Sequence, residues 1–115
     1  MKFDITNEIK SGAINTNINP EKQNRHIRNS DCYVPERSYL LDNIDAQKLV
    51  NEYSGTGDIR LNRTNTAWIN KEFIIADRDI GVNINNKTGV QTLTNRFTIH
   101  YSKTGTHVVP TERMN

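Results

Sequence analysis

Apolar and polar positions alternate along the last third of the chain, as they do in strands that are buried on one side of a sheet. The segment 96–102 shows this most clearly. Its apolar face consists of Phe97, Ile99 and Tyr101, and its polar face consists of Arg96, Thr98, His100 and Ser102. The same pattern and several short apolar runs predict further strands at 66–70, 71–76, 80–84, 90–93 and 107–109, with a turn at 85–89. The second half of the chain therefore predicts an antiparallel meander.

Two helices are expected before these strands. Asn19, Pro20 and Glu21 form a typical helix start, with a capping side chain, a proline in the first turn and an acid beside it, which predicts a helix to about Arg28. A second helix is expected over 44–53. We expect Asp42 or Asn43 to cap it, Gly55 to end it, and Ile44, Leu49, Val50 and Tyr53 to face the core. Residues 1–18 predict a short strand or loop, and residues 31–39 a loop. Helices followed by antiparallel strands indicate an α+β domain with the helices on one face of the sheet.

Composition limits the kind of protein this is. The chain has 115 residues, so we expect a single domain over 1–115 with a modest core. Hydrophobic residues make up 34% and charged residues 24%, which is not the composition of a disordered chain. No apolar run approaches the roughly 20 residues of a membrane helix, and the N-terminal residues have no apolar core of a secretory signal. Cys32 is the only cysteine, which excludes an intrachain disulfide and a multi-cysteine zinc site.

The net charge of +2 hides an asymmetry between the two halves. Residues 1–59 carry seven basic and nine acidic side chains, whereas residues 60–115 carry eight and four. The basic half is the half with the strands. A basic surface beside a polar cleft suits a polyanionic ligand, although ordinary surface charge would look the same.

The candidate chemistry is concentrated in a predicted hairpin at 99–110. This segment holds two of the three histidines together with a lysine, a tyrosine and several hydroxyl groups. A two-residue loop at Thr104 and Gly105 would place Ser102 opposite His107, with His100 on the same side. A three-residue loop would place Tyr101 opposite His107 and turn the two histidines to opposite faces. The sequence alone leaves both registers open.

Histidines in this arrangement allow several interpretations. An isolated histidine is usually a surface residue or a hydrogen-bonded structural one. Grouping favours chemistry instead, because His26 would share a helix face with Lys22 and Gln23, and imidazoles titrate near neutral pH. Three histidines are also enough to hold zinc with an open position, but no short metal-ligand spacing is present, so we expect neither a metal nor a cofactor.

The order of several short motifs resembles a known family. The segments that carry the resemblance are Lys22-Gln23, His26-Ile27, Ser38-Tyr39-Leu40, Gly55-Thr56-Gly57, Glu72, Ile80-Gly81, Thr88-Gly89, Ile99 to Lys103, Gly105-Thr106-His107 and Pro110. Together they resemble the bacterial polymorphic toxin type 50 domain over residues 18–112. The final hairpin and the Lys-Gln…His-Ile segment are its most specific parts. One departure is that Arg28-Asn29-Ser30 stands where a Gly-Thr pair is expected.

The resemblance implies the fold that barnase, EndoU, colicin and RelE nucleases share, with N-terminal helices packed on a four- to five-stranded antiparallel sheet. It also implies a metal-independent ribonuclease, with transfer RNA as a substrate by analogy with that fold. Such domains occur at the C-terminal end of polymorphic toxins and of some phage minor head proteins. Toxins of this kind act in the cytoplasm of a target or host bacterium after secretion or phage delivery. We therefore expect RNA and a cognate immunity protein as partners, a monomer, and no membrane.

On this basis we expect cleavage by attack of the ribose 2′-hydroxyl on the adjacent phosphate, which needs an acid, a base and donors for the phosphorane. His26 and His107 are assigned as the acid–base pair in either order, and Lys103 as the cation that stabilises the phosphorane. The expected hydrogen-bond donors to phosphate are Thr106, Ser102 and Ser38. The secondary candidates are His100, Tyr101, Arg28 and Lys22.

A second class of function remains open at this point. The same hairpin groups would serve as a binding surface if the domain were a non-enzymatic interaction module of a phage or secreted protein. That alternative predicts no turnover of RNA and tight binding to a partner that survives the loss of His26.

Overall fold

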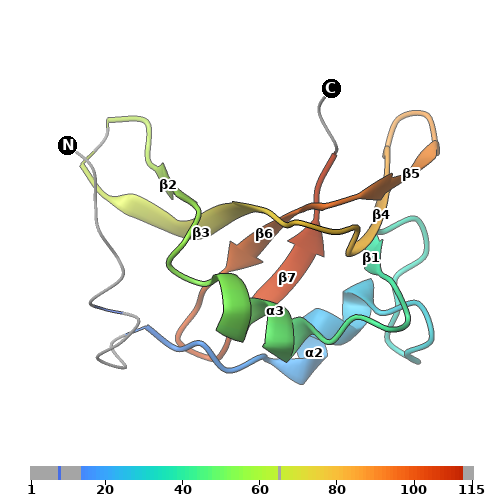
Figure 1. Cartoon of the computed structure of the whole chain (residues 1–115), viewed down its shortest axis with the longest axis horizontal. Coiled ribbons are helices and arrows are strands. Elements are labelled where there is room, and N and C mark those ends of the chain that lie inside the picture. Colours follow the sequence, from blue (N-terminus) through green and yellow to red (C-terminus); the bar gives the residue numbers. More distant parts are fainter. Residues whose placement is uncertain (1–7, 9–13, 65, 113–115) are drawn as a thin grey trace.

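A computed structural model describes residue 8 and residues 14–64 and 66–112 (Figure 1). The strands form two antiparallel sheets, one of four strands in the order β2-β3-β6-β7 and one of three in the order β1-β4-β5. The described helices are α2 (Pro20–Gln23), which continues as the 3-10 turn η1 (Asn24–His26), and α3 (Ala46–Tyr53). The chain therefore has an α+β architecture in which strands dominate.

The four-stranded sheet consists of β2 (Asp58–Leu61), β3 (Trp68–Ile75), β6 (Arg96–His100) and β7 (His107–Pro110). Its two faces differ because strand side chains alternate. One face is buried and carries Ile74, Phe97, Ile99 and Val108, each at most 1% exposed. The opposite face, which we call the open face, carries Lys71, Phe73, Thr98, His100, His107 and Val109, all partly exposed.

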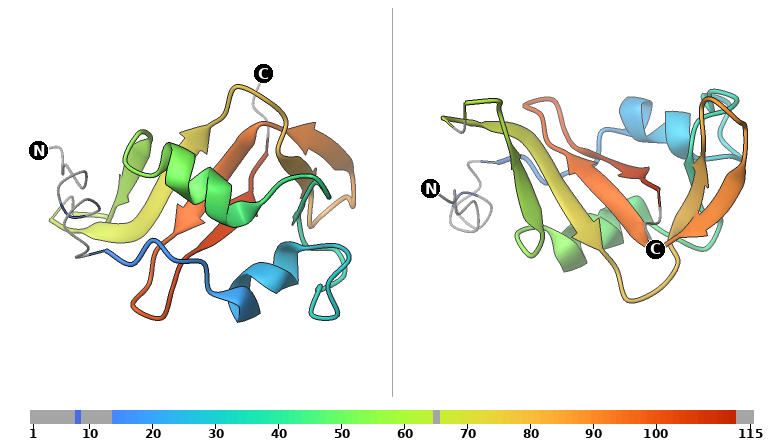
Figure 2. Two further views of the ribbon diagram at one scale, coloured as in Figure 1. Left: turned by 60° about the horizontal axis from the view of Figure 1, so that its bottom comes forward. Right: turned by 90° about the horizontal axis from the view of Figure 1, so that it is seen from above.

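Helix α3 supplies the other half of the core. Asp45 caps its N-terminus by accepting a hydrogen bond from the Lys48 amide at 3.2 Å. Leu49 and Val50 are at most 1% exposed and belong to the same apolar cluster as Ile74 and Phe97. Helix α3 packs on the buried face of the four-stranded sheet, whereas α2 lies beside the outer edge of β7, where Gln23 pairs with Val108, and the right-hand view of Figure 2 shows the two helices apart. Helix α2 and η1 thus border the open face.

The three-stranded sheet consists of β1 (Tyr39–Leu40), β4 (Gly81–Ile84) and β5 (Gln91–Thr94). Strand β1 pairs with β4, and β4 forms a hairpin with β5. A turn at 85–89 joins the hairpin, where Gly89 has a positive φ of 75°. This sheet adjoins β7, because both β1 and β4 contact it. Its strand β1 also contacts η1, so this sheet lies next to the end of η1 that carries His26.

A buried carboxylate fixes the turn before β2. Glu72 has no exposed surface, and its two oxygens accept hydrogen bonds from the amides of Gly55 and Gly57 at 3.0 and 2.8 Å. The Tyr101 hydroxyl donates a third, at 2.7 Å. Gly57 has no room for a side chain, since a Cβ there would lie 2.2 Å from the Phe73 carbonyl oxygen. Glu72 therefore ties together the turn at 55–57, β3 and the end of β6.

Several expectations from the sequence need correction. The single sheet of four or five strands is instead two sheets, and the expected packing of N-terminal helices on it is not confirmed. The first helix ends at Gln23 and tightens into η1 rather than reaching Arg28, and α3 begins two residues later than expected, with Asp45 as its cap. The two strands predicted at 66–70 and 71–76 are one, β3. Strands β1 and β2 were not predicted, and most of residues 1–18 lies outside the described residues.

Candidate active site

The three histidines form a stack on the open face. The His100 and His107 ring centroids are 4.7 Å apart with an angle of 20° between the planes. His26 lies on the other side of His107, at 6.0 Å and 12°. His107 is thus the middle ring of this group, which we call the histidine stack. Residues far apart in the chain therefore converge on one site.

The register of the hairpin brings His100 and His107 together. These two residues are direct partners in the β6–β7 pairing, so their side chains leave the sheet on the same face. The connection is longer than either loop considered from the sequence, because residues 101–106 all lie outside the two strands. Both expected pairings, Ser102 or Tyr101 opposite His107, were therefore wrong.

The hairpin is anchored to the segment before α2. Thr106 donates its amide to the Asn17 carbonyl and accepts from the Asn19 amide, both at 2.8 Å. Gly105 has a φ of 122°, and a Cβ there would lie 2.9 Å from the Asn19 Cβ, so both backbone conformation and space favour glycine. The Thr106 hydroxyl is buried and donates to the His100 carbonyl at 2.6 Å. The anchored hairpin and α2 thereby hold a fixed relative position.

Gln23 makes the second link between α2 and the hairpin. Its amide is 1% exposed and pairs with both backbone groups of Val108, donating to the carbonyl at 3.0 Å and accepting from the amide at 2.6 Å. The side chain thus pairs with the outer edge of β7 as a neighbouring strand would. Because His107 precedes Val108 and His26 follows Gln23 by three residues, this contact sets the spacing of the two histidines.

His26 has a defined tautomer. Its Nδ1 lies 2.9 Å from the Ser38 carbonyl oxygen, which only accepts, so Nδ1 carries the proton. In the neutral ring Nε2 then holds the lone pair and is able to accept a proton. The Nδ1 of His107 is buried and has no hydrogen-bond partner among the described residues.

All three rings favour the neutral form. Burial lowers the pKa of His26 below its ordinary 6.5, with Arg37 and Arg25 adding to the effect and the Ser38 hydrogen bond opposing it. Burial and then Lys71 lower the pKa of His100 to about 4. Burial, the two neighbouring histidines, and the charges of Lys22 and Arg25 lower the pKa of His107 to about 4. The stack is thus ringed by cations.

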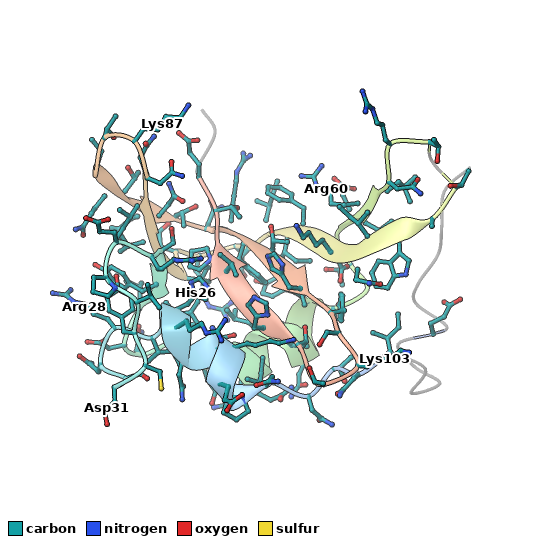
Figure 3. All side chains as sticks on the ribbon, turned by 180° about the vertical axis from the view of Figure 1, so that it is seen from behind. His26, Arg28, Asp31, Arg60, Lys87 and Lys103 are labelled. Atoms are coloured by element: carbon teal, nitrogen blue, oxygen red, sulfur yellow. The ribbon has the colours of Figure 1, made fainter. Side chains whose placement is uncertain are left out.

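The residues that supply this positive charge differ from those expected. Lys22 is the amine that acts on His107, and it also donates to the Ser102 and Thr104 hydroxyls at 3.0 and 3.2 Å. Lys103 instead lies at the exposed end of the hairpin, well away from His26 in Figure 3. Sequence reasoning missed Arg25, Arg37 and Lys71 altogether. No local pattern in the sequence marks these three cations, because only the folded chain brings them to the histidines.

The remaining candidates divide between the site and the scaffold. Ser38 lies beside the stack, where its hydroxyl donates to Asn83 Oδ1 at 3.2 Å and accepts from the Ile84 amide at 3.0 Å. Arg28 lies over the Tyr39 ring, 5.4 Å from its centroid, at the outer end of the molecule. Tyr101 points away from the stack into the core, and burial together with Glu72 raises its pKa.

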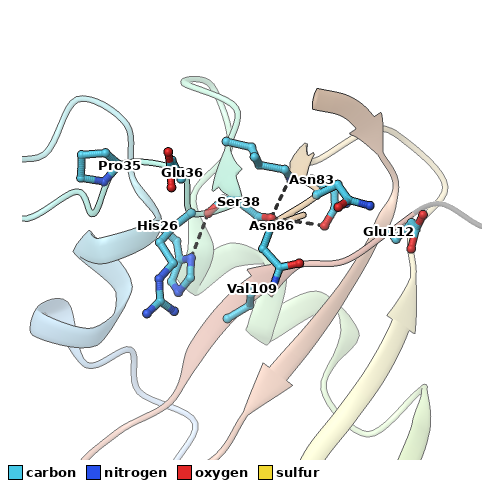
Figure 4. A pocket seen from close by; sticks show the side chains of 11 residues that line it. His26, Pro35, Glu36, Ser38, Asn83, Asn86, Val109 and Glu112 are labelled. Carbon is cyan, nitrogen blue, oxygen red and sulfur yellow. Dashed lines mark hydrogen bonds between the residues drawn. The ribbon is translucent and has the colours of Figure 1, made fainter. Parts of the chain in front are cut away.

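A cleft of about 650 Å³ opens beside His26 (Figure 4). We call it the side cleft. Its polar lining is provided by His26, Glu36, Arg37, Ser38, Asn83, Asn85, Asn86 and Glu112. Its walls are the loop before β1, the β4–β5 hairpin and the end of β7. His26 therefore belongs both to the histidine stack and to the wall of this cleft.

Metal ligation is not suggested by this geometry. Among the described residues, no group of three or more histidine, cysteine or acidic side chains could hold a metal ion. The histidine rings are nearly parallel, whereas metal ligands point their nitrogens at a common centre. What the site does offer is a ring nitrogen with a free lone pair, a second imidazole beside it and a cationic surround. These groups are suited to transferring protons next to a bound anion.

Comparison with known proteins gives the class of protein to which this domain belongs. The family model described as bacterial toxin 50 matches residues 18–110. The chain therefore belongs to that family and is a polymorphic toxin domain. The matched segment begins just before α2 and ends with β7, so it contains the whole histidine stack. No curated protein matches the sequence. No helix among the described residues is long and apolar enough to cross a membrane.

Proposed function

We propose that this toxin domain is a metal-independent endoribonuclease. The observation that carries the proposal is the pairing of His26 and His107 within a ring of cations, next to a cleft large enough for a nucleotide. RNA supplies its own nucleophile in the 2′-hydroxyl, so the protein needs an acid, a base and stabilisation of negative charge. The toxin family supports a damaging activity of this kind.

The geometry supports a division of roles between the two histidines. His26 is the general base, because its Nδ1–H is fixed by Ser38 and Nε2 holds a lone pair. It removes the proton of the 2′-hydroxyl while that oxygen attacks phosphorus. His107 in its protonated form is the general acid, which gives its proton to the departing 5′-oxygen. The products are a 2′,3′-cyclic phosphate and a free 5′-hydroxyl.

Cations and hydroxyls around the stack hold the phosphate. Lys22, Arg25 and Lys71 lower the histidine pKa values in the free protein because they repel a protonated ring. A bound phosphate reverses that effect, since its negative charge favours protonated His107. Substrate binding thus prepares the acid. The Ser102 hydroxyl, already bonded to Lys22, is the hydroxyl best placed to join that phosphate contact.

Partners and place of action follow from the family and stay proposals. A ribonuclease toxin needs an immunity protein in the cell that makes it, and transfer RNA is a candidate substrate in the cytoplasm of the target bacterium. We propose that the domain acts as a monomer after delivery as part of a secreted or phage-borne protein.

The test is cleavage of total RNA by the purified domain in the presence of EDTA, with His107→Ala as the comparison. We expect new fragments that end in 2′,3′-cyclic phosphate, reduced about 10²- to 10⁴-fold in the variant. Circular dichroism of both proteins checks that the variant is folded. Intact RNA with a folded wild-type domain would overturn the proposal and favour a non-enzymatic interaction module. Such a module is expected to keep binding its partner after the loss of His26.

A further inference from the structure

We propose that the side cleft binds the base of the nucleotide that is cut, and that this base is guanine. The inference rests on the proposed ribonuclease activity and adds a substrate preference to it. Three observations carry it: the position of His26 in the cleft wall, the carboxylates in the cleft, and the donors of Arg37 and Asn83 that face them.

The first observation fixes which nucleotide would enter. His26 accepts the 2′-hydroxyl proton in the proposed reaction, and the same ring lines the side cleft. In a ribonucleotide the base is attached to C1′, the neighbour of the carbon that carries the 2′-hydroxyl. The phosphate on the 3′ side must reach His107, the ring next to His26 in the stack. The base of that same nucleotide is then the group nearest the cleft.

The second observation separates the cleft from the phosphate site. Lys22, Arg25 and Lys71 surround the stack, whereas the cleft contains two carboxylates, Glu36 and Glu112. Figure 4 shows these two acids at opposite sides of the cleft. Carboxylates repel a phosphate but accept hydrogen bonds from a neutral base. The cleft volume of about 650 Å³ lies within the range of roughly 300–1,000 Å³ typical of small-ligand sites.

The third observation concerns donors that face the carboxylates. Arg37 lines the cleft and brings a guanidinium with several N–H groups. Asn83 uses its oxygen to accept from Ser38 at 3.2 Å, and Figure 4 shows its amide nitrogen turned away from that contact. The cleft thus offers both strong acceptors and strong donors to whatever enters it.

Guanine is the base that matches both sets. Its N1–H and 2-amino group form an adjacent pair of donors that fits one carboxylate, and its O6 and N7 form an adjacent pair of acceptors that fits a guanidinium. Adenine and cytosine each present one amino group, and uracil presents one N–H. None of these three bases offers two neighbouring donors together with two neighbouring acceptors.

The experiment uses DNA oligomers that contain one ribonucleotide, so that cleavage has a single site. Five substrates carry guanosine, inosine, adenosine, cytidine or uridine at that position. We expect kcat/KM for guanosine to exceed that for adenosine, cytidine and uridine by roughly ten- to a hundredfold. Inosine lacks only the 2-amino group and is expected to lie between. Equal cleavage at all bases, or a preference for another base, would overturn the inference.

Two variants test the carboxylates directly. Glu36→Gln and Glu112→Gln each keep the size of the side chain and remove its charge. We expect one of them to lower the ratio of kcat/KM for guanosine to kcat/KM for adenosine about tenfold. Glu21→Gln is the matched control, because Glu21 is exposed on α2 and does not line the cleft. An unchanged ratio in both cleft variants would also overturn the inference.

A binding measurement separates this inference from the proposed activity. Wild-type protein is titrated with guanosine 3′-monophosphate and, separately, adenosine 3′-monophosphate, and the amide signals of Ser38 and Asn83 are followed by NMR. Tighter binding of the guanosine nucleotide without any RNA cleavage would overturn the ribonuclease and keep the guanine site. Cleavage without a preference in either experiment would keep the ribonuclease and overturn the guanine site.

Discussion

The two faces of the four-stranded sheet come from the same strands but treat polar groups in opposite ways. Glu72 and Tyr101 belong to the buried face, and their hydrogen bonds to each other and to the turn at 55–57 lie within the protein. Lys71 and His100, their immediate neighbours in sequence, belong to the open face. There His107 keeps a buried ring nitrogen without a partner among the described residues. A shift of one position along each strand therefore separates the structural hydrogen-bond network of the buried face from the candidate active site on the open face.

This difference indicates that the open face contributes less to the stability of the folded protein than the buried face does. A buried polar atom without a partner costs about 1–3 kcal/mol, and crowding cations around neutral imidazoles adds repulsion whenever a ring is protonated. The buried face avoids both costs by satisfying its carboxylate completely. Exceptions of this kind are expected at functional sites, where the missing partner is the ligand.

The strongest way to test the contrast is to disable the open face without disturbing the buried one. In His26→Asn, the amide nitrogen still donates to the Ser38 carbonyl, but no lone pair replaces Nε2. We expect kcat/KM for RNA to fall about 10²- to 10⁴-fold, because the proposed general base is lost. The urea midpoint should stay close to that of the wild type. A variant that cleaves RNA normally would remove His26 from the mechanism.

The converse change acts on the buried face. Glu72→Gln replaces one carboxylate oxygen by a donor, so at least one of the amides of Gly55 and Gly57 or the Tyr101 hydroxyl loses its acceptor. We expect the free energy of unfolding to fall by about 1–3 kcal/mol, measured by urea denaturation, with kcat/KM of the folded protein little changed. Glu21→Gln on the exposed side of α2 provides the control. Equal stability of both variants would contradict the role given to Glu72.

Acid should lower the stability of the folded protein through the histidines of the open face. The pKa values of His100 and His107 are about 4 in the folded chain, and each returns towards 6.5 on unfolding. Between these values the unfolded chain binds more protons, so the free energy of unfolding rises with pH from about 4 to 6.5 and falls as acid is added. Urea midpoints at pH 4.5 and 7 measure this. The double variant His100→Gln/His107→Gln should show a smaller difference, and parallel curves would refute the expectation.

The smallest expected effect concerns the charge around the stack. Lys71 lies beside His100 on the open face, whereas Lys48 is exposed on α3 behind the buried face. Binding of an uncleavable single-stranded DNA oligomer should depend less on salt in Lys71→Met than in the wild type. The slope of log Kd against log salt should fall by about 0.7, the value for one lost phosphate contact. Lys48→Met should leave the slope unchanged. The same slope in both variants would place the nucleic acid away from the open face.

The sequence predicted those elements of the fold that show a local pattern, and it did not predict those that depend on contacts between distant residues. Alternation at 96–102 predicted β6 and its two faces, and the Asn19–Pro20 start predicted α2. The two-residue strand β1 is too short to show any period, and its pairing with β4 depends on a hairpin more than forty positions later. The division into two sheets follows from such distant contacts, so no local pattern indicates it.

The candidate site shows the same limit. Grouping alone brought His26 and His107 forward, and the structure places them in one stack. Lys103 was selected because it is close to His107 in sequence, yet Lys22 is the amine close to it in space. Gln23 was named as a neighbour of His26 on a helix face, but its pairing with Val108 needs the edge of β7 to be known. Side chains that act through tertiary contacts are those that sequence reasoning placed least well.

The distance along the chain between His26 and His107 also bears on how the protein is made. A ribosome produces α2 and η1 early and β7 late, and the stack exists only after β7 has paired with β6 and bonded to Gln23. In the mechanism proposed above, a chain that still lacks β7 therefore has no complete acid–base pair. Under that proposal, the order of synthesis keeps the nascent domain of this toxin family inactive until β7 has folded.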